Sequence, residues 1–109
     1  MKNKYGIPEE DLKKIRARDE MCVYCHKKMV DPTDNNDCRK DWATIEHLNH
    51  LPPWNNPSTV AFCCGSCNSS RSNKKIIDWF ETAYCIEKNI NYNTVANPVK
   101  NYIENYELR

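Results

Sequence analysis

The chain has 109 residues, of which 39% are hydrophobic and 28% are charged, and its formal net charge is +1 at pH 7. This length fits one domain spanning residues 1–109, and the composition excludes disordered and fibrous proteins. No apolar run approaches the roughly 18 residues that a membrane span needs. The N-terminus, MKNKYGIPEEDLKK, lacks the apolar region of a secretory signal. We therefore expect a soluble, cytoplasmic protein without a membrane partner.

The near-neutral net charge conceals an uneven distribution. Residues 64–77 contain three basic residues and no acidic residue, whereas residues 29–63 contain two basic and five acidic residues. A protein that binds polyanions over its whole surface would be more basic. The distribution favours a local cationic surface near residues 64–77.

The N-terminal third predicts one helix followed by a loop. The helix is expected over residues 7–20, because Pro8 suits the first helical position and acidic residues occupy the next turn. Leu12 and Ile15 supply the apolar spacing of a helix face. Residues 27–41 are rich in Asp and Asn, which predicts a surface loop.

The middle of the chain predicts two short strands, at residues 42–45 and 60–63. The intervening residues 47–59 contain three prolines and are expected to be irregular. The two strands can form a hairpin with a long connection.

The C-terminal part is predicted to be helical from residue 67 onward. Asn68 and the two serines after it offer N-capping groups, and a break near residues 72–73 precedes a longer helix from Ile76 towards Lys88. Residues 98–106 predict a final helix. The apolar stripe on these helices suits either core packing or a dimer face.

Seven cysteines are unusual in so short a chain. An odd number without a sign of export argues against a disulfide framework. Four of them form two pairs of identical spacing, in which one tight turn can present both sulfurs to a tetrahedral ion. These residues are Cys22, Cys25, Cys64 and Cys67. The repeated spacing predicts one structural zinc that joins distant parts of the chain.

Other interpretations of the cysteines are weaker. A single Cys-x-x-Cys pair also occurs in redox proteins, so a thiol-redox function is one alternative to zinc binding. Cys63 competes with Cys64 for the second half-site, but its spacing to Cys67 is looser. Burial as reduced thiols accounts for Cys38, Cys63 and Cys85. His26 is expected to be exposed rather than a zinc ligand.

An acid–histidine pair, Glu46-His47, lies between the two cysteine pairs, and Asn68 directly follows the last zinc cysteine. Zinc binding would bring the predicted hairpin and the helix together, so these three side chains are expected to converge. Carboxylate and amide oxygens suit Mg²⁺, and a neutral imidazole can accept a proton from water. One metal ion and one base suffice for phosphodiester hydrolysis.

The chain contains a cysteine pair, then the acid–histidine pair, and then a second cysteine pair followed by Asn and a basic residue. This order of motifs resembles that of the zinc-containing HNH endonucleases, and most closely their endonuclease VII-like branch. The resemblance covers about residues 16–75 and leaves about 76–109 as a C-terminal helical extension. It implies an α+β fold, a small ββα-metal domain with a structural four-cysteine zinc site and flanking helices.

The resemblance also implies roles for individual residues. His47 matches the general base, Glu46 and Asn68 match the ligands of a catalytic Mg²⁺ or Mn²⁺, and the four paired cysteines match ligands of a structural Zn²⁺. Arg71 matches a phosphate contact, which Lys74 and Lys75 extend. DNA is the implied partner. A second copy of the chain is a candidate partner, because cleaving both strands with one active site often requires two copies.

Two positions depart from the family pattern. The acid is more often Asp, and Glu46 is one methylene longer. The family's middle Asn usually lies five residues before the third zinc cysteine, where this chain has Thr59. Asn55, Asn56 or Thr59 itself are the candidates for that position.

Structural roles compete with each functional assignment. Glu46 and His47 can be surface residues at a strand end, Asn68 can be a helix N-cap, and the three basic residues can form a solvated helix face. His50 is expected to be a loop residue. The tryptophans at 42, 54 and 79 are expected to pack in the core or loops, with Trp54 also a candidate DNA contact. The alternative function is therefore a non-catalytic zinc module that binds nucleic acid or protein.

Overall fold

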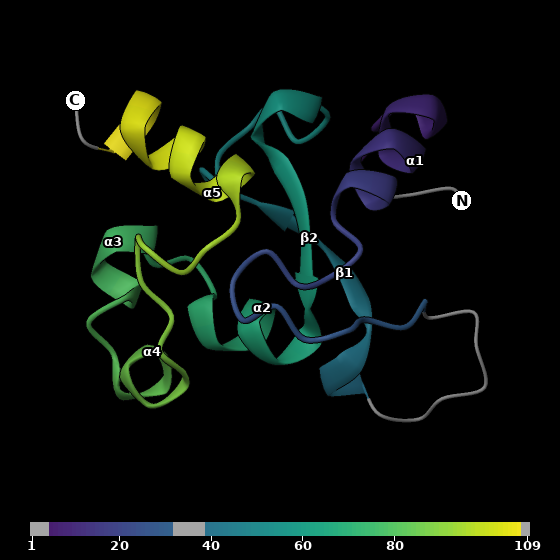
Figure 1. Cartoon of the computed structure of the whole chain (residues 1–109). Helices are drawn as coiled ribbons and strands as arrows, with labels where there is room; N and C mark the ends of the chain where they lie inside the picture. The colour runs from purple at the N-terminus through teal and green to yellow at the C-terminus, as the bar shows by residue number, and fades with distance from the viewer. Residues whose placement is uncertain (1–4, 32–38, 108–109) are drawn as a thin grey trace.

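The computed structural model describes residues 5–31 and 39–107. Its centre is an antiparallel hairpin of β1 (Ala43–His47) and β2 (Val60–Cys64), which pairs Ala43 with Cys64 and His47 with Val60. Helices surround the hairpin (Figure 1). This arrangement confirms a small α+β fold with a two-stranded sheet. The observed β1 extends two residues beyond the predicted strand and includes both Glu46 and His47.

Helix α1 (Glu9–Arg18) lies on one side of the hairpin (Figure 1) and buries Leu12 and Ile15, as the apolar spacing predicts. It is two residues shorter at each end than expected. At its C-terminal end, the buried Asp19 carboxylate accepts a hydrogen bond from the Phe62 backbone N–H at 3.0 Å. This contact fixes α1 against β2.

Helix α2 (Gly65–Arg71) follows β2 without a connecting loop. Its N-cap is Cys64, whose Sγ accepts from the Cys67 backbone N–H at 3.5 Å. The interpretation of Asn68 as an N-cap is therefore wrong, because Asn68 lies inside the helix. The predicted break is confirmed at Ser72, where a φ of 52° ends α2.

The C-terminal part forms three short helices, α3 (Ile76–Trp79), α4 (Ala83–Lys88) and α5 (Asn97–Tyr102), and α5 continues as a π turn, η3 (Ile103–Glu107). The expectation of one longer helix from residue 76 towards 88 is wrong. Thr82 adopts an extended backbone and its hydroxyl donates to the Trp79 carbonyl at 2.7 Å, which replaces a helical hydrogen bond and turns the chain.

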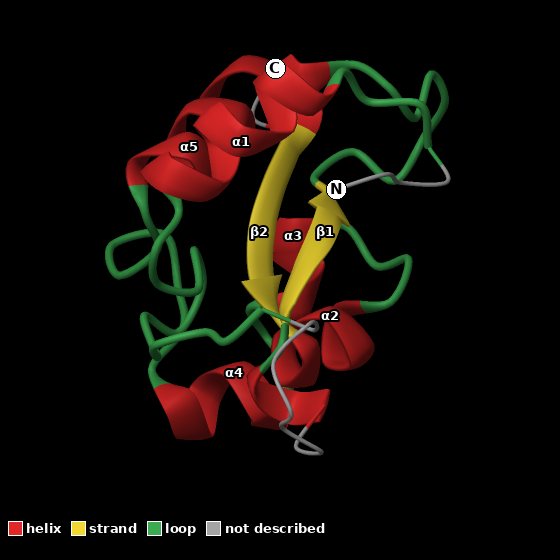
Figure 2. Cartoon of the chain, turned by 90° about the vertical axis from the view of Figure 1, so that its right-hand side faces the viewer, coloured by secondary structure: helices red, strands yellow, loops and turns green. Residues whose placement is uncertain are grey.

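The C-terminal extension packs directly on the first cysteine loop. Trp79 is fully buried, with its ring centroid 4.8 Å from that of Tyr24. The Ala96 backbone N–H donates to the Val23 carbonyl at 2.8 Å. Figure 2 shows α1 and α5 towards one end of the hairpin, and α2 and α4 towards the other. Within the described residues, no helix is both long and apolar enough to cross a membrane.

Candidate metal centres

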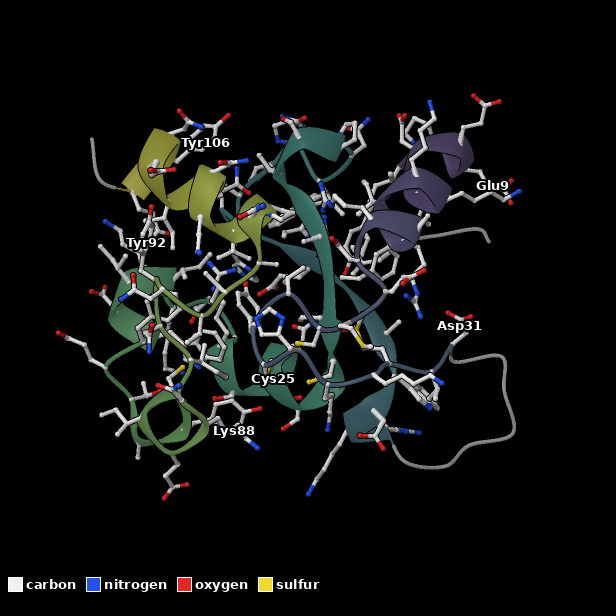
Figure 3. The ribbon with its side chains drawn as sticks, viewed as in Figure 1. Glu9, Cys25, Asp31, Lys88, Tyr92 and Tyr106 are labelled. Atoms are coloured by element: carbon white, nitrogen blue, oxygen red, sulfur yellow. The ribbon has the colours of Figure 1, made fainter. Side chains whose placement is uncertain are left out.

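The four paired cysteines come together in one cluster. The sulfurs of Cys22, Cys25, Cys64 and Cys67 all lie within 4.8 Å of one another. The Cys25 and Cys64 sulfurs are 3.8 Å apart, and sulfurs about 2.3 Å from a tetrahedral zinc ion are about 3.8 Å from each other. Figure 3 places Cys25 near the middle of the molecule, with Glu9, Asp31 and Tyr106 at its periphery. The cluster can hold a metal such as zinc, as the spacing predicts.

The four thiols also perturb one another's ionisation. Hydrogen bonding with Cys22 lowers the pKa of Cys64 to about 7 and lowers the pKa of Cys25 as well. Hydrogen bonding within the cluster raises the pKa values of Cys22 and Cys67. A divalent ion would favour ionisation of all four, because its charge offsets their mutual repulsion.

The neighbouring candidate ligands stay outside this cluster. Cys63 is buried on β2, and its sulfur lies 3.8 Å from the Thr44 hydroxyl. Cys85 is buried in α4, and Cys38 lies outside the described residues. His26 is exposed and its Nε2 bonds the Thr94 carbonyl. Cys64 rather than Cys63 therefore completes the second half-site.

A tyrosine of the C-terminal extension contacts the cluster. The Tyr84 hydroxyl donates to the Cys67 sulfur at 3.3 Å and lies 2.8 Å from the Ser66 hydroxyl. Burial, followed by the hydrogen bond to Cys67, raises the pKa of Tyr84, so the phenol keeps its proton. The sequence places Tyr84 only on an apolar helix face, because no local pattern links it to a cysteine 17 residues away.

Glu46 is held by one of its two carboxylate oxygens. Oε2 accepts from the Tyr24 hydroxyl at 2.6 Å and from Arg71 Nη1 at 3.1 Å. Burial raises the pKa of Tyr24 well above its usual value, which keeps the phenol a donor. Oε1 accepts no hydrogen bond from any residue that the structure describes.

His47 is likewise held through one ring nitrogen. Nε2 lies 2.8 Å from the Trp54 carbonyl oxygen. A carbonyl only accepts, so Nε2 carries the proton, and Nδ1 is the acceptor in the neutral ring. The rings of Tyr5 and Trp54 pack edge-on against the imidazole, with centroids 4.3 and 5.0 Å away. Trp54, expected as a loop residue or DNA contact, therefore orients His47 through its backbone and its ring.

Asn68 follows the same pattern. Its Nδ2 donates to the Thr44 hydroxyl at 3.0 Å and to the Ile45 carbonyl at 3.2 Å. Its Oδ1 has no partner among the described residues. The amide is thus oriented with its nitrogen towards β1 and its oxygen available.

Each of the three side chains therefore offers one acceptor atom, Glu46 Oε1, His47 Nδ1 or Asn68 Oδ1. Among the described residues, no buried side-chain nitrogen or oxygen lacks a hydrogen-bond partner. These three acceptors have none, so each keeps some contact with solvent, but Glu46 and His47 are only 3% and 6% exposed. The interpretation of these two as surface residues at a strand end is therefore wrong. The two oxygens are hard ligands of the kind that Mg²⁺ takes, and the nitrogen is a proton acceptor. The chemistry of these donors therefore suits a hydrated divalent cation and a base.

Helix α2 packs along β1, the strand that carries Glu46 and His47. Asn68 bonds the carbonyl of Ile45, the residue before Glu46. One turn later, Arg71 bonds the Glu46 carboxylate and donates to the carbonyls of His47 at 3.1 Å and Leu48 at 2.6 Å. Hydrogen bonds therefore join α2 to the end of β1, and the convergence of the Glu46, His47 and Asn68 side chains stays a prediction.

The role predicted for Arg71 requires a correction. Its position in the sequence suggests a phosphate contact, but the residue is only 1% exposed and its guanidinium donates to internal acceptors. A buried ion pair with Glu46 accounts for this position, so Arg71 is not retained as a phosphate contact. Lys74 and Lys75 are exposed.

The candidates for the middle Asn of the HNH pattern lie in the loop before β2. Thr59 is buried, its hydroxyl donates to the Asn56 carbonyl at 3.1 Å, and its own carbonyl accepts from the Leu48 N–H at 2.8 Å. Asn56 caps η2 (Pro57–Thr59) through its side chain. Asn55 and His50 are exposed. Thr59 thus holds the loop that carries Trp54 close to the end of β1.

Comparison with known proteins adds no assignment. No family model, curated protein or solved structure matches the chain. The residues and their geometry are therefore the basis for assigning a function.

Proposed function

We propose that this chain is a metal-dependent endonuclease of the HNH type that hydrolyses DNA phosphodiester bonds. The observation that carries the proposal is the set of three acceptors on side chains that are each fixed at their other end. A structural role would satisfy both ends of each group inside the protein. A ββα-metal domain with Zn²⁺ on the four cysteines is part of the same proposal.

His47 is the general base. The carbonyl of Trp54 holds Nε2–H and thereby directs the Nδ1 lone pair away from the loop. Nδ1 removes a proton from water as the water oxygen attacks phosphorus, and the bond from phosphorus to the 3′ oxygen breaks. The products are a 5′ phosphate and a 3′ hydroxyl. The two flanking aromatic rings restrict the imidazole to this orientation.

Glu46 and Asn68 would hold the catalytic Mg²⁺ or Mn²⁺ through Oε1 and Oδ1. When bound, such an ion polarises the scissile phosphate and stabilises charge on the leaving oxygen. Tyr24 and Arg71 orient the Glu46 carboxylate through Oε2, as partners of a ligating carboxylate commonly do. Lys74 and Lys75 would contact the DNA backbone.

A plasmid-nicking assay with Mg²⁺ or Mn²⁺ tests this proposal. Wild-type protein is expected to nick DNA, and His47→Ala to reduce the rate by about 10²–10⁴-fold, the usual contribution of a general base. His50→Asn is the matched control, because it removes a histidine three residues away and Asn tolerates the positive φ of 49° there. Absence of nicking by the wild type, or equal nicking by His47→Ala, contradicts the proposal.

One observation favours the alternative, a non-catalytic zinc module that binds nucleic acid or protein. The charge of Glu46 is already paired with Arg71 at 3.1 Å, so the carboxylate is stable without a second cation. In that case the wild type binds DNA or a protein without cleaving it, and His47→Ala leaves binding unchanged.

A further inference from the structure

A cavity lies beside Asn68, between η1 (Arg39–Asp41) and α2. Its volume is about 400 Å³, within the range of ligand sites in proteins. The side chains that define its chemistry are those of Arg39, Lys40, Trp42, Thr44, Asn68 and Ser69. It combines two cations, an aromatic ring and several uncharged hydrogen-bonding groups.

Main-chain contact between η1 and α2 fixes the shape of this cavity. A Cβ atom built on Gly65 would lie 2.0 Å from the Arg39 carbonyl oxygen, so only glycine permits this close approach. The Gly65 N–H also donates to the Trp42 carbonyl at 3.1 Å. The two walls are therefore held together by backbone rather than by mobile side chains.

The cavity is cationic. None of the described residues that line it is acidic, and the neighbouring Asp41 forms an ion pair with Lys27 at 2.7 Å. Lys40 is exposed and has no hydrogen bond or ion pair with any residue that the structure describes. The Arg39 guanidinium lies over the Trp42 ring, 5.6 Å from its centroid. Two positive charges next to an apolar ring suit an anion attached to a planar or apolar group.

The cavity borders the candidate hydrolytic site at Asn68. Asn68 lines it, and the Asn68 amide donates to the hydroxyl of Thr44, which also lines it. A molecule in the cavity would therefore lie beside a side chain that we assign to the catalytic ion.

We propose that this cavity binds one nucleotide of the DNA strand, next to the scissile phosphate. Arg39 and Lys40 bind its phosphate, and Trp42 packs against its sugar or base. The inference rests on the proposed function, and it adds where the substrate strand lies, on the η1 side of α2.

The test compares two double variants of the full chain in DNA binding, measured by fluorescence anisotropy over a salt series without added divalent ion. Arg39→Gln with Lys40→Gln removes the cavity charges, and Lys13→Gln with Lys14→Gln removes the same charge from exposed positions on α1. We expect weaker binding from the cavity variant. Its slope of log affinity against log salt should fall by about 0.9, since Arg39 and Lys40 bind one phosphate and each neutralised phosphate contributes about 0.9. Equal affinities and slopes for the two variants would overturn the inference.

Two further results separate this inference from the proposed function. If the wild type nicks plasmid and the cavity variant nicks and binds like the α1 variant, the inference fails and the function stands. If the wild type never nicks but the cavity variant alone loses DNA binding, the catalytic proposal fails and the cavity remains a nucleotide site. Lys40→Glu, a single change at an exposed side chain, is expected to weaken binding with unchanged thermal stability, and unaltered binding by it would contradict the inference.

Discussion

The two candidate metal centres differ in how completely the protein occupies their ligand atoms. In the four-cysteine cluster, all four sulfurs face one another and three of the four residues are buried. In the group of Glu46, His47 and Asn68, each side chain bonds the protein through one polar atom and leaves the other without a partner among the described residues. Structural metal sites are closed, whereas catalytic sites keep positions open for water and substrate. Under our proposal, the first centre supports folding and the second carries the chemistry.

The contrast predicts different consequences for stability and activity. Changes at the cysteine cluster should remove the fold, and changes at the open group should remove activity while most of the fold remains. Four substitutions probe this difference, from the largest expected effect on the free energy of unfolding to the smallest.

Loss of the metal from the cysteine cluster should have the largest effect. Structural zinc contributes about 10–16 kcal/mol in small domains, so Cys67→Ser or chelation is expected to abolish the cooperative thermal transition. Circular dichroism and zinc content per chain measure both effects. Cys63→Ala is the matched control, a buried cysteine adjacent to a ligand, and it should keep one zinc. A stable metal-free chain would show that the cluster is not what holds the fold.

Arg71→Leu should come second. It leaves the Glu46 carboxylate buried without its cation, and breaking a buried ion pair in this way costs about 3–5 kcal/mol. Denaturant unfolding measures the loss, and Lys75→Leu on the exposed side of the same segment should change little. Unchanged stability with weaker DNA binding would instead restore Arg71 as a phosphate contact.

Asn68→Ala separates the two centres most directly. It removes the hydrogen bonds to Thr44 and Ile45, so stability should fall by about 1–3 kcal/mol. Nicking should be lost if Oδ1 binds the catalytic ion, while the zinc content stays at one per chain. Full nicking activity in this variant would remove Asn68 from the open group.

Tyr84→Phe should have the smallest effect on unfolding, about 0.5–1.5 kcal/mol for one hydrogen bond. Zinc affinity is the more sensitive readout. Substitution of a residue that hydrogen-bonds a metal ligand commonly lowers metal affinity by about 10–100-fold. Competition with a chromophoric chelator measures this. Tyr92→Phe, on the same extension but outside the cluster, is the control, and equal affinities in the two variants would argue against a role for Tyr84.

The helices show why sequence patterns located elements better than their ends. Leu12 and Ile15 predicted α1 correctly, because a repeating apolar face is a local property of the chain. The end of α3 was missed, because Thr82 bonds the Trp79 carbonyl only once the chain has turned there. The capping of α2 was missed too, since a thiol of the cysteine cluster caps that helix instead of an Asn or Ser.

The sequence by itself determined the four cysteines, because two short identical spacings of one ligand type are typical of a tetrahedral metal site. It also singled out Glu46, His47 and Asn68 as chemically suited to a cation and a base. Only the tertiary structure decided which atoms of those three are available, since distant residues occupy their other ends and no local pattern relates the partners. The burial of Arg71 depends on α2 packing along β1, and the cavity depends on α2 packing against η1. Both are contacts between segments far apart in the chain, which no local pattern predicts.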